Sequence, residues 1–155
     1  MQQFKENNLS KKLAVDGGIP IRDKMLPYGR QALDESDIES VVNVLTSDWL
    51  TTGPKVGEFE ELFTEIIGIE EAVVVNSGTA ALHAAMYAIG ISSGDEVILP
   101  AITFVATANC VLYQGGIPIF ADVHADTMLI DVTKIESKIT SNTKAIIAVD
   151  YAGQP

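Results

Sequence analysis

The sequence has few of the residues that build covalent or metal-bound frameworks. Its 155 residues include a single cysteine, Cys110, and two histidines. One cysteine cannot form an intramolecular disulfide or a cysteine-rich metal site. Free thiols are typical of reducing compartments. Because Met1 to Lys12 is polar and holds no apolar signal core, we expect a cytoplasmic protein.

Basic residues are also scarce, with 10 lysines and arginines against 21 acidic residues and a formal net charge of −11. An acidic surface repels a phosphodiester backbone, so nucleic acid is not an expected partner. A small phosphorylated ligand is still compatible with this charge. Backbone amides at the start of a helix can bind a phosphate group without any basic side chain.

The stretch from Val97 to Ala121 contains no charged residue, which raises the question of a membrane helix. Pro100, Asn109, the Gly115-Gly116 pair and Pro118 interrupt it, and acidic rather than basic residues flank it. These features favour a buried core segment. We therefore expect no association with a membrane.

Apolar spacing predicts two amphipathic helices early in the chain. The first covers Leu33–Thr46, with Asp34 and Ser36 as candidate caps. The second runs from Val56 to Ile66 and ends at Gly68.

Short β-branched runs then alternate with helical stretches. The predicted strands are Ala72–Val75, Glu96–Leu99, Ile117–Ala121 and Ala145–Val149, and the predicted helices are Thr79–Ile89, Thr103–Tyr113 and Val132–Ile139. This alternation predicts an α/β fold, with a mostly parallel sheet and flanking helices.

We divide the chain into an N-terminal tail or arm, residues 1–26, and an incomplete large domain, residues 27–155. The last predicted strand is followed by Asp150–Pro155, which would leave the carboxyl edge of the sheet. Ligand sites of open α/β sheets lie at that edge. Since a domain rarely stops inside its own ligand edge, we interpret the chain as a fragment.

A candidate phosphate site follows the first predicted strand. There the turn Ser77-Gly78-Thr79 leads into a helix of small residues. Such a turn points free N–H groups and the helix dipole at one spot, and glycine lets an anion approach the backbone. Ordinary helix capping by Ser77 or Thr79 is the alternative. The motif is neither a P-loop nor a dinucleotide fingerprint.

A candidate aromatic platform follows the second predicted strand. Phe104 would lie just past the carboxyl end of that strand, on the same sheet edge as Ser77 to Thr79. A ring at that place could stack on a flat heterocycle. The alternative is that Phe104 is a core residue. The two histidines, His83 and His124, fit neither a catalytic triad nor a metal-ligand spacing.

Taken together, the ordered segments over about residues 27 to 155 resemble the DegT/StrS family of nucleotide-sugar aminotransferases. The matching segments are Leu50-Thr51-Thr52-Gly53-Pro54, Phe59-Glu60, Asn76-Ser77-Gly78-Thr79-Ala80-Ala81-Leu82, Gly94-Asp95-Glu96-Val97-Ile98, Thr103-Phe104-Val105-Ala106-Thr107-Ala108-Asn109, Pro118-Ile119-Phe120-Ala121-Asp122-Val123 and Thr143-Lys144-Ala145-Ile146-Ile147. Each segment is weak alone, but the ordered set is specific.

The resemblance implies the N-terminal part of the large domain of a fold-type-I enzyme that uses pyridoxal 5'-phosphate (PLP), working as a homodimer. It implies that Gly78, Thr79 and Ala80 bind the cofactor phosphate and that Phe104 stacks on the pyridine ring. Tyr28 and Thr51 match segments that approach the sugar substrate.

The family transfers an amino group from glutamate to a keto group on a nucleotide-linked sugar, with PLP as the electron sink. Its Schiff-base lysine and its pyridine-pairing aspartate match positions beyond Pro155, so we assign no catalytic residue within the chain. Where many members carry a histidine, this chain has Asp150. The sequence around Asp150 resembles that of the pseudaminic acid branch of the family. That branch aminates a UDP-linked 4-keto-6-deoxy-N-acetyl sugar. A PLP-dependent sugar dehydratase and a non-catalytic binding or regulatory module are the alternatives.

Overall fold

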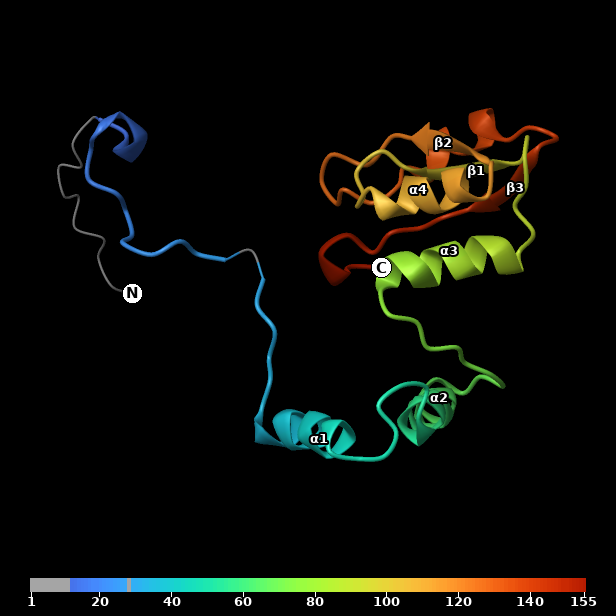
Figure 1. The fold of residues 1–155 in the computed structure, drawn as a ribbon. Helices are drawn as coiled ribbons and strands as arrows, with labels where there is room; N and C mark the ends of the chain where they lie inside the picture. The colour runs from blue at the N-terminus through green and yellow to red at the C-terminus, as the bar shows by residue number, and fades with distance from the viewer. Residues whose placement is uncertain (1–11, 28) are drawn as a thin grey trace. The chain divides into compact units, whose positions relative to one another are not determined.

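The computed structural model describes residues 12–27 and 29–155, and the chain divides into two compact units, Met1–Thr51 and Thr52–Pro155 (Figure 1). The first unit holds a short 3-10 helix, Ala14–Asp16, and helix α1, Glu35–Leu45. Asp34 caps α1 as predicted, because its carboxylate accepts from the N–H groups of Ser36 and Asp37. Asp37 returns the bond by accepting from the Asp34 N–H at 2.9 Å.

The second unit begins with helix α2, Pro54–Ile67. Pro54 suits the first turn because the N–H that it lacks would have no partner inside the helix. Gly68 ends α2 with φ of 74°, as predicted, in the left-handed region that favours glycine.

Three strands form the sheet of the second unit: β1, Glu96–Pro100, β2, Ile117–Ala121, and β3, Thr143–Ile146. All pairings are parallel, in the order β2-β1-β3, which confirms the predicted parallel sheet. Val97 to Pro100 of the central strand are buried, as expected for a strand covered on both faces. In β2, Pro118 lies opposite Val97, and the preceding Ile117 N–H donates to the Asp95 carbonyl at 2.8 Å.

Two helices form successive layers over the sheet (Figure 1). Helix α4, Ala106–Tyr113, packs on β1 and β2, and helix α3, Gly78–Ala88, packs on α4. The core lies between these layers and contains Met86, Ile91, Val97, Leu99, Cys110 and Val111. His83 of α3 meets Tyr113 of α4 edge-on, with ring centroids 5.2 Å apart.

The predicted strand at Ala72–Val75 is wrong, because this segment joins no ladder in the described part of the chain. Both edges of β1 are already paired, with β2 and with β3. Val73 is 82% exposed, and the Val74 N–H instead donates to the Glu60 carboxylate at 2.8 Å. Apolar β-branched residues alone therefore do not make a strand, because a strand also needs a neighbour whose N–H and C=O groups it can pair with.

Two predicted helical segments differ from the observed structure. The third strand, β3, also begins and ends earlier in the chain than predicted. The region Val132–Ile139 holds two 3-10 turns, Val132–Lys134 and Glu136–Lys138, in place of an α-helix. Its N–H groups bond to carbonyls three residues earlier, as from Lys138 to Ile135 at 2.8 Å. The helix expected from Thr103 begins at Ala106, so residues 103–105 belong to the preceding loop. Strand β3 ends at Ile146, although the Ile147 N–H still donates to the Ile98 carbonyl at 2.8 Å. Among the described residues, no helix is both long and apolar enough to cross a bilayer.

The turn before β1 leads to a pH-dependent prediction. The Ser92 hydroxyl donates to the Asp95 carboxylate at 2.8 Å and lowers the pKa of Asp95, which burial partly opposes. The Ser92 N–H donates at 2.9 Å, and the Lys144 ammonium lies 3.9 Å away. These contacts favour the charged carboxylate in the folded state, so they stabilise the fold above the unfolded-state pKa of about 3.9.

We expect Asp95→Asn to lower the unfolding midpoint at neutral pH. The difference from the wild type should shrink as the pH falls through the folded-state pKa of Asp95, since protonation removes the same interactions. Urea unfolding at a series of pH values measures the difference. A gap that stays constant down to pH values where Asp95 is protonated would contradict the assignment, and Ser92→Ala should reproduce a smaller effect of the same sign.

Candidate cofactor site

The turn before α3 combines a capped helix start with open backbone donors. Ser77 precedes the helix in an extended conformation, and its hydroxyl accepts from the Ala80 N–H at 3.2 Å. The Ala81 N–H bonds to the Ser77 carbonyl at 3.0 Å. Within the described residues, the N–H groups of Gly78 and Thr79 donate to no protein acceptor. Capping by Ser77 and an anion site at Gly78 and Thr79 are therefore compatible.

Gly78 leaves room for a ligand at this helix start. A Cβ built on Gly78 meets no atom within 4 Å, and its φ is outside the left-handed region. The backbone conformation does not require glycine here, and nothing in the protein fills the space beside it. Two free donors, an open approach and the positive end of a helix of 11 residues together fit an anionic group such as a phosphate.

The hollow beside this turn is apolar, with a volume of about 360 Å³. Its walls come from α2, from the segment before α3 and from the first turns of α3, and its lining residues are Phe59, Glu60, Phe63, Ile69, Ala72, Val73, Val74, Val75, Ser77, Gly78 and Ala81. No lysine or arginine lines it, so a bound anion would rely on backbone N–H groups and the helix dipole. The Glu60 carboxylate lines the hollow too and accepts from the Val74 N–H at 2.8 Å, a contact that sequence reasoning did not predict.

Phe104 lies in the loop between β1 and α4, and its side chain is 73% exposed. The alternative that Phe104 is a core residue is thus wrong for the described chain. The β1–α4 loop and the start of α3 lie at the same end of the layers, toward which the parallel strands point (Figure 1). This common edge is the one that the sequence predicts for Phe104 and the Ser77–Thr79 turn.

Two further predicted site residues, Thr51 and Tyr28, are not among the described residues of the second unit. Thr51 is exposed and ends the first compact unit, so it is described within that unit alone. Tyr28 lies outside the described residues. The candidate site of the second unit therefore consists of Gly78, Thr79, Ala80 and Phe104.

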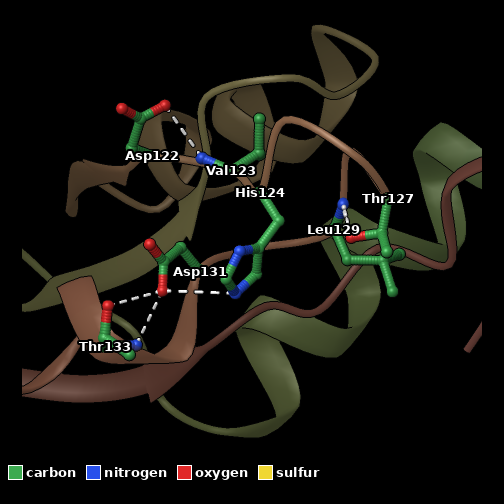
Figure 2. A network of polar contacts seen from close by, with 7 residues as sticks. All are labelled: Asp122, Val123, His124, Thr127, Leu129, Asp131 and Thr133. Carbon is green, nitrogen blue, oxygen red and sulfur yellow. Dashed lines mark hydrogen bonds and ion pairs between the residues drawn. The ribbon is translucent and has the colours of Figure 1, made fainter.

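A separate polar network lies in the loop after β2 (Figure 2). The Asp131 carboxylate accepts from the Thr133 hydroxyl at 2.6 Å and the Thr133 N–H at 2.9 Å, and His124 Nε2 lies 3.5 Å from it. The Thr133 hydroxyl has the largest part in lowering the pKa of Asp131. Sequence reasoning did not pair His124 with Asp131, although both flank one short loop. The described residues hold no cluster of three or more His, Cys, Asp or Glu side chains that could bind a metal ion.

Comparison with known proteins identifies relatives of this chain. Residues 31–155 match the DegT/DnrJ/EryC1/StrS aminotransferase family. A curated relative from Shewanella sediminis, UDP-4-amino-4-deoxy-L-arabinose–oxoglutarate aminotransferase, is 47% identical over 131 residues, which are 84% of this chain and 34% of the relative.

Solved structures share the fold. Spr1654 of Streptococcus pneumoniae, assigned as a sugar aminotransferase, has a TM-score of 0.79 and 37% identity over 84% of this chain and 33% of its own. PseC of Helicobacter pylori, an aminotransferase of pseudaminic acid biosynthesis, has a TM-score of 0.76 and 39% identity over 85% and 36% of the two chains. The chain thus spans about a third of the length of these relatives.

These comparisons confirm the fold class and the cofactor predicted from the sequence. Spr1654 has been solved in PLP, pyridoxamine phosphate and apo forms, and aminotransferases of the family bind PLP. The parallel sheet with flanking helices agrees with the fold-type-I architecture of these neighbours. With a family match that covers most of its length, the chain belongs to the DegT/DnrJ/EryC1/StrS aminotransferases.

Proposed function

We propose that this chain provides the phosphate and ring half-site of a PLP-dependent nucleotide-sugar aminotransferase. The reaction would move an amino group from glutamate to the keto group of a UDP-linked 4-keto-6-deoxy-N-acetyl sugar. The observation that carries this proposal is the start of α3, where the N–H groups of Gly78 and Thr79 have no protein acceptor among the described residues and a Cβ on Gly78 would meet no atom within 4 Å.

The substrate class rests on two relatives. The Shewanella sediminis enzyme bears a UDP-linked 4-amino sugar and oxoglutarate in its name, and PseC belongs to pseudaminic acid biosynthesis. Oxoglutarate is the keto acid that glutamate becomes when it gives up its amino group. The first name favours a glutamate donor and a UDP-linked keto-sugar acceptor for this chain, and the second favours a sugar of the pseudaminic acid branch.

PLP would supply the electron sink that lets the amino group leave one carbon and join another. The chain's own residues would bind and orient it. The N–H groups of Gly78 and Thr79 would donate to the phosphate, and Ala80 would join them only if its bond to Ser77 were shared or released. The exposed Phe104 ring would stack on the pyridine. Tyr28 and Thr51 would face the sugar, and we expect a cytoplasmic homodimer.

The test is an assay of the complete natural protein with PLP, glutamate and the UDP-linked keto-sugar. We expect one 2-oxoglutarate for each keto group that becomes an amine, with mass analysis identifying the amino sugar. Omission of glutamate should abolish the product. If the protein binds PLP but the sugar loses water without consuming glutamate, the dehydratase alternative is correct. If PLP does not bind at all, the half-site itself is misassigned.

A further inference from the structure

Thr107 is a polar residue inside the core. Among the residues that the structure describes, it is the only buried polar side chain, with 5% exposure. Its hydroxyl lies 2.7 Å from the hydroxyl of Thr103, one helical turn earlier in the chain. A buried hydroxyl is costly unless it is hydrogen-bonded, so this pair satisfies both groups.

The backbone of Thr107 also contacts the loop between β1 and α4, which contains Thr103 and Phe104. Its N–H donates to the Phe104 carbonyl at 3.0 Å, and its carbonyl accepts from Cys110 Sγ at 3.2 Å. At the opposite end of the loop, the Ala101 N–H donates to the Ala121 carbonyl at 2.8 Å. Thr107 is thus bonded to the two consecutive residues 103 and 104 and is itself anchored within α4.

This arrangement fixes the backbone of Phe104 and leaves its ring exposed. Phe104 has its carbonyl bonded and the residue before it tied to the core, yet its side chain is 73% exposed. An apolar ring that is presented to solvent on a rigid loop contributes to ligand binding without a further ordering cost. The same ring on a loose loop would lose that advantage.

We propose that the hydroxyl pair of Thr103 and Thr107 positions Phe104 as a preformed aromatic platform for the flat ring of the cofactor. This inference rests on the proposed function, because it concerns how well the ring stacks on PLP. Thr103 and Thr107 are positioning residues that act through Phe104, and neither is assigned a contact with the cofactor.

The test compares dissociation constants for PLP in the complete natural protein, measured by absorbance titration. Thr107→Val keeps the shape of the side chain but removes the hydroxyl, so we expect binding to weaken by about 3- to 10-fold, as for one lost hydrogen bond. Thr107→Ser restores the hydroxyl and should bind nearly as tightly as the wild type. Thr103→Val should match Thr107→Val, and the double variant should be no weaker than either single one.

The Phe104→Ala background separates positioning from a general loss of structure. There, adding Thr107→Val should not weaken PLP binding further, because the ring that it positions is gone. Ile98→Val, in the buried centre of β1, serves as a control that lowers the thermal midpoint without changing the affinity for PLP.

Three results would overturn the inference: equal weakening by Thr107→Val with and without Phe104, failure of Thr107→Ser to restore affinity, or comparable weakening by Ile98→Val. Failure of the proposed function looks different. If the half-site does not hold the cofactor, the wild-type protein itself shows no saturable PLP binding. If PLP binds but glutamate is not consumed, the reaction class is wrong, while the comparison of the variants for PLP affinity still stands.

Discussion

Replacing Gly78 by alanine is expected to weaken PLP binding by about 10- to 100-fold, as expected when donors to a charged phosphate are obstructed. The added methyl group would occupy the space through which the phosphate reaches the N–H groups of Gly78 and Thr79. That space is open in the protein, since the built Cβ meets no atom within 4 Å. The substitution therefore affects the ligand and not the fold.

The affinity for PLP is measured by absorbance titration, with thermal unfolding as a check on the fold. Gly57→Ala is the matched control, because Gly57 also lies in a helix with no atom within 4 Å of its built Cβ and does not line the hollow beside α3. Both variants should unfold at or slightly above the wild-type temperature, since alanine favours helix over glycine. Wild-type affinity in Gly78→Ala would remove the start of α3 from the cofactor site.

Gly116→Ala is expected to destabilise the second unit by about 1–3 kcal/mol, the range for overpacking a close-fitted core. Gly116 is buried just before β2. A Cβ there would lie 2.7 Å from Ile91 Cγ2 and 2.9 Å from Val111 Cγ1, closer than real side chains approach. The Asp95 carbonyl, 3.2 Å away, is held by its bond to the Ile117 N–H and has little freedom to move.

Urea unfolding of the wild type, Gly116→Ala and Gly57→Ala measures this effect. The three proteins separate the cost of a methyl group in the core from the general effect of exchanging glycine for alanine. We expect opposite signs for the two variants, because the Gly57 methyl group meets open space. If Gly116→Ala unfolds at the wild-type midpoint, then Ile91 and Val111 repack at no cost, and the core is looser there than the distances indicate.

The sequence correctly predicts those helices and strands whose ends are set by neighbouring residues in the chain. Strand β2 follows its β-branched run from end to end, Asp34 caps α1, and Gly68 ends α2. The start of α3 falls at Gly78, within one residue of its predicted position, because a Ser-Gly-Thr turn both caps the helix and breaks the preceding segment. Gly78, Thr79 and Phe104 reach the sheet edge that this local pattern implies, while their role in binding PLP is still a prediction.

Features that depend on a distant partner are not visible in the sequence. The Val73–Val75 run has the composition of a strand, but whether it pairs depends on which edges of the sheet are free. The hydrogen bond from Val74 to Glu60 joins residues that no periodicity relates. Thr103 and Thr107 share helical spacing, which could have suggested their contact, yet Thr103 lies in the loop before α4. Only the path of the chain between β1 and α4 brings their hydroxyls together.

The position of Pro118 limits how this sheet can associate with other strands. Neighbouring residues of a strand direct their N–H groups to opposite sides. Because the Ile117 N–H points to β1, the place where Pro118 lacks an N–H is on the outer side of β2. That edge offers an incomplete template to any incoming strand, which is a common protection against edge-to-edge aggregation. The outer edge of β3, Thr143–Ile146, contains no proline, so this sheet can accept a further strand with its full set of hydrogen bonds on the β3 side.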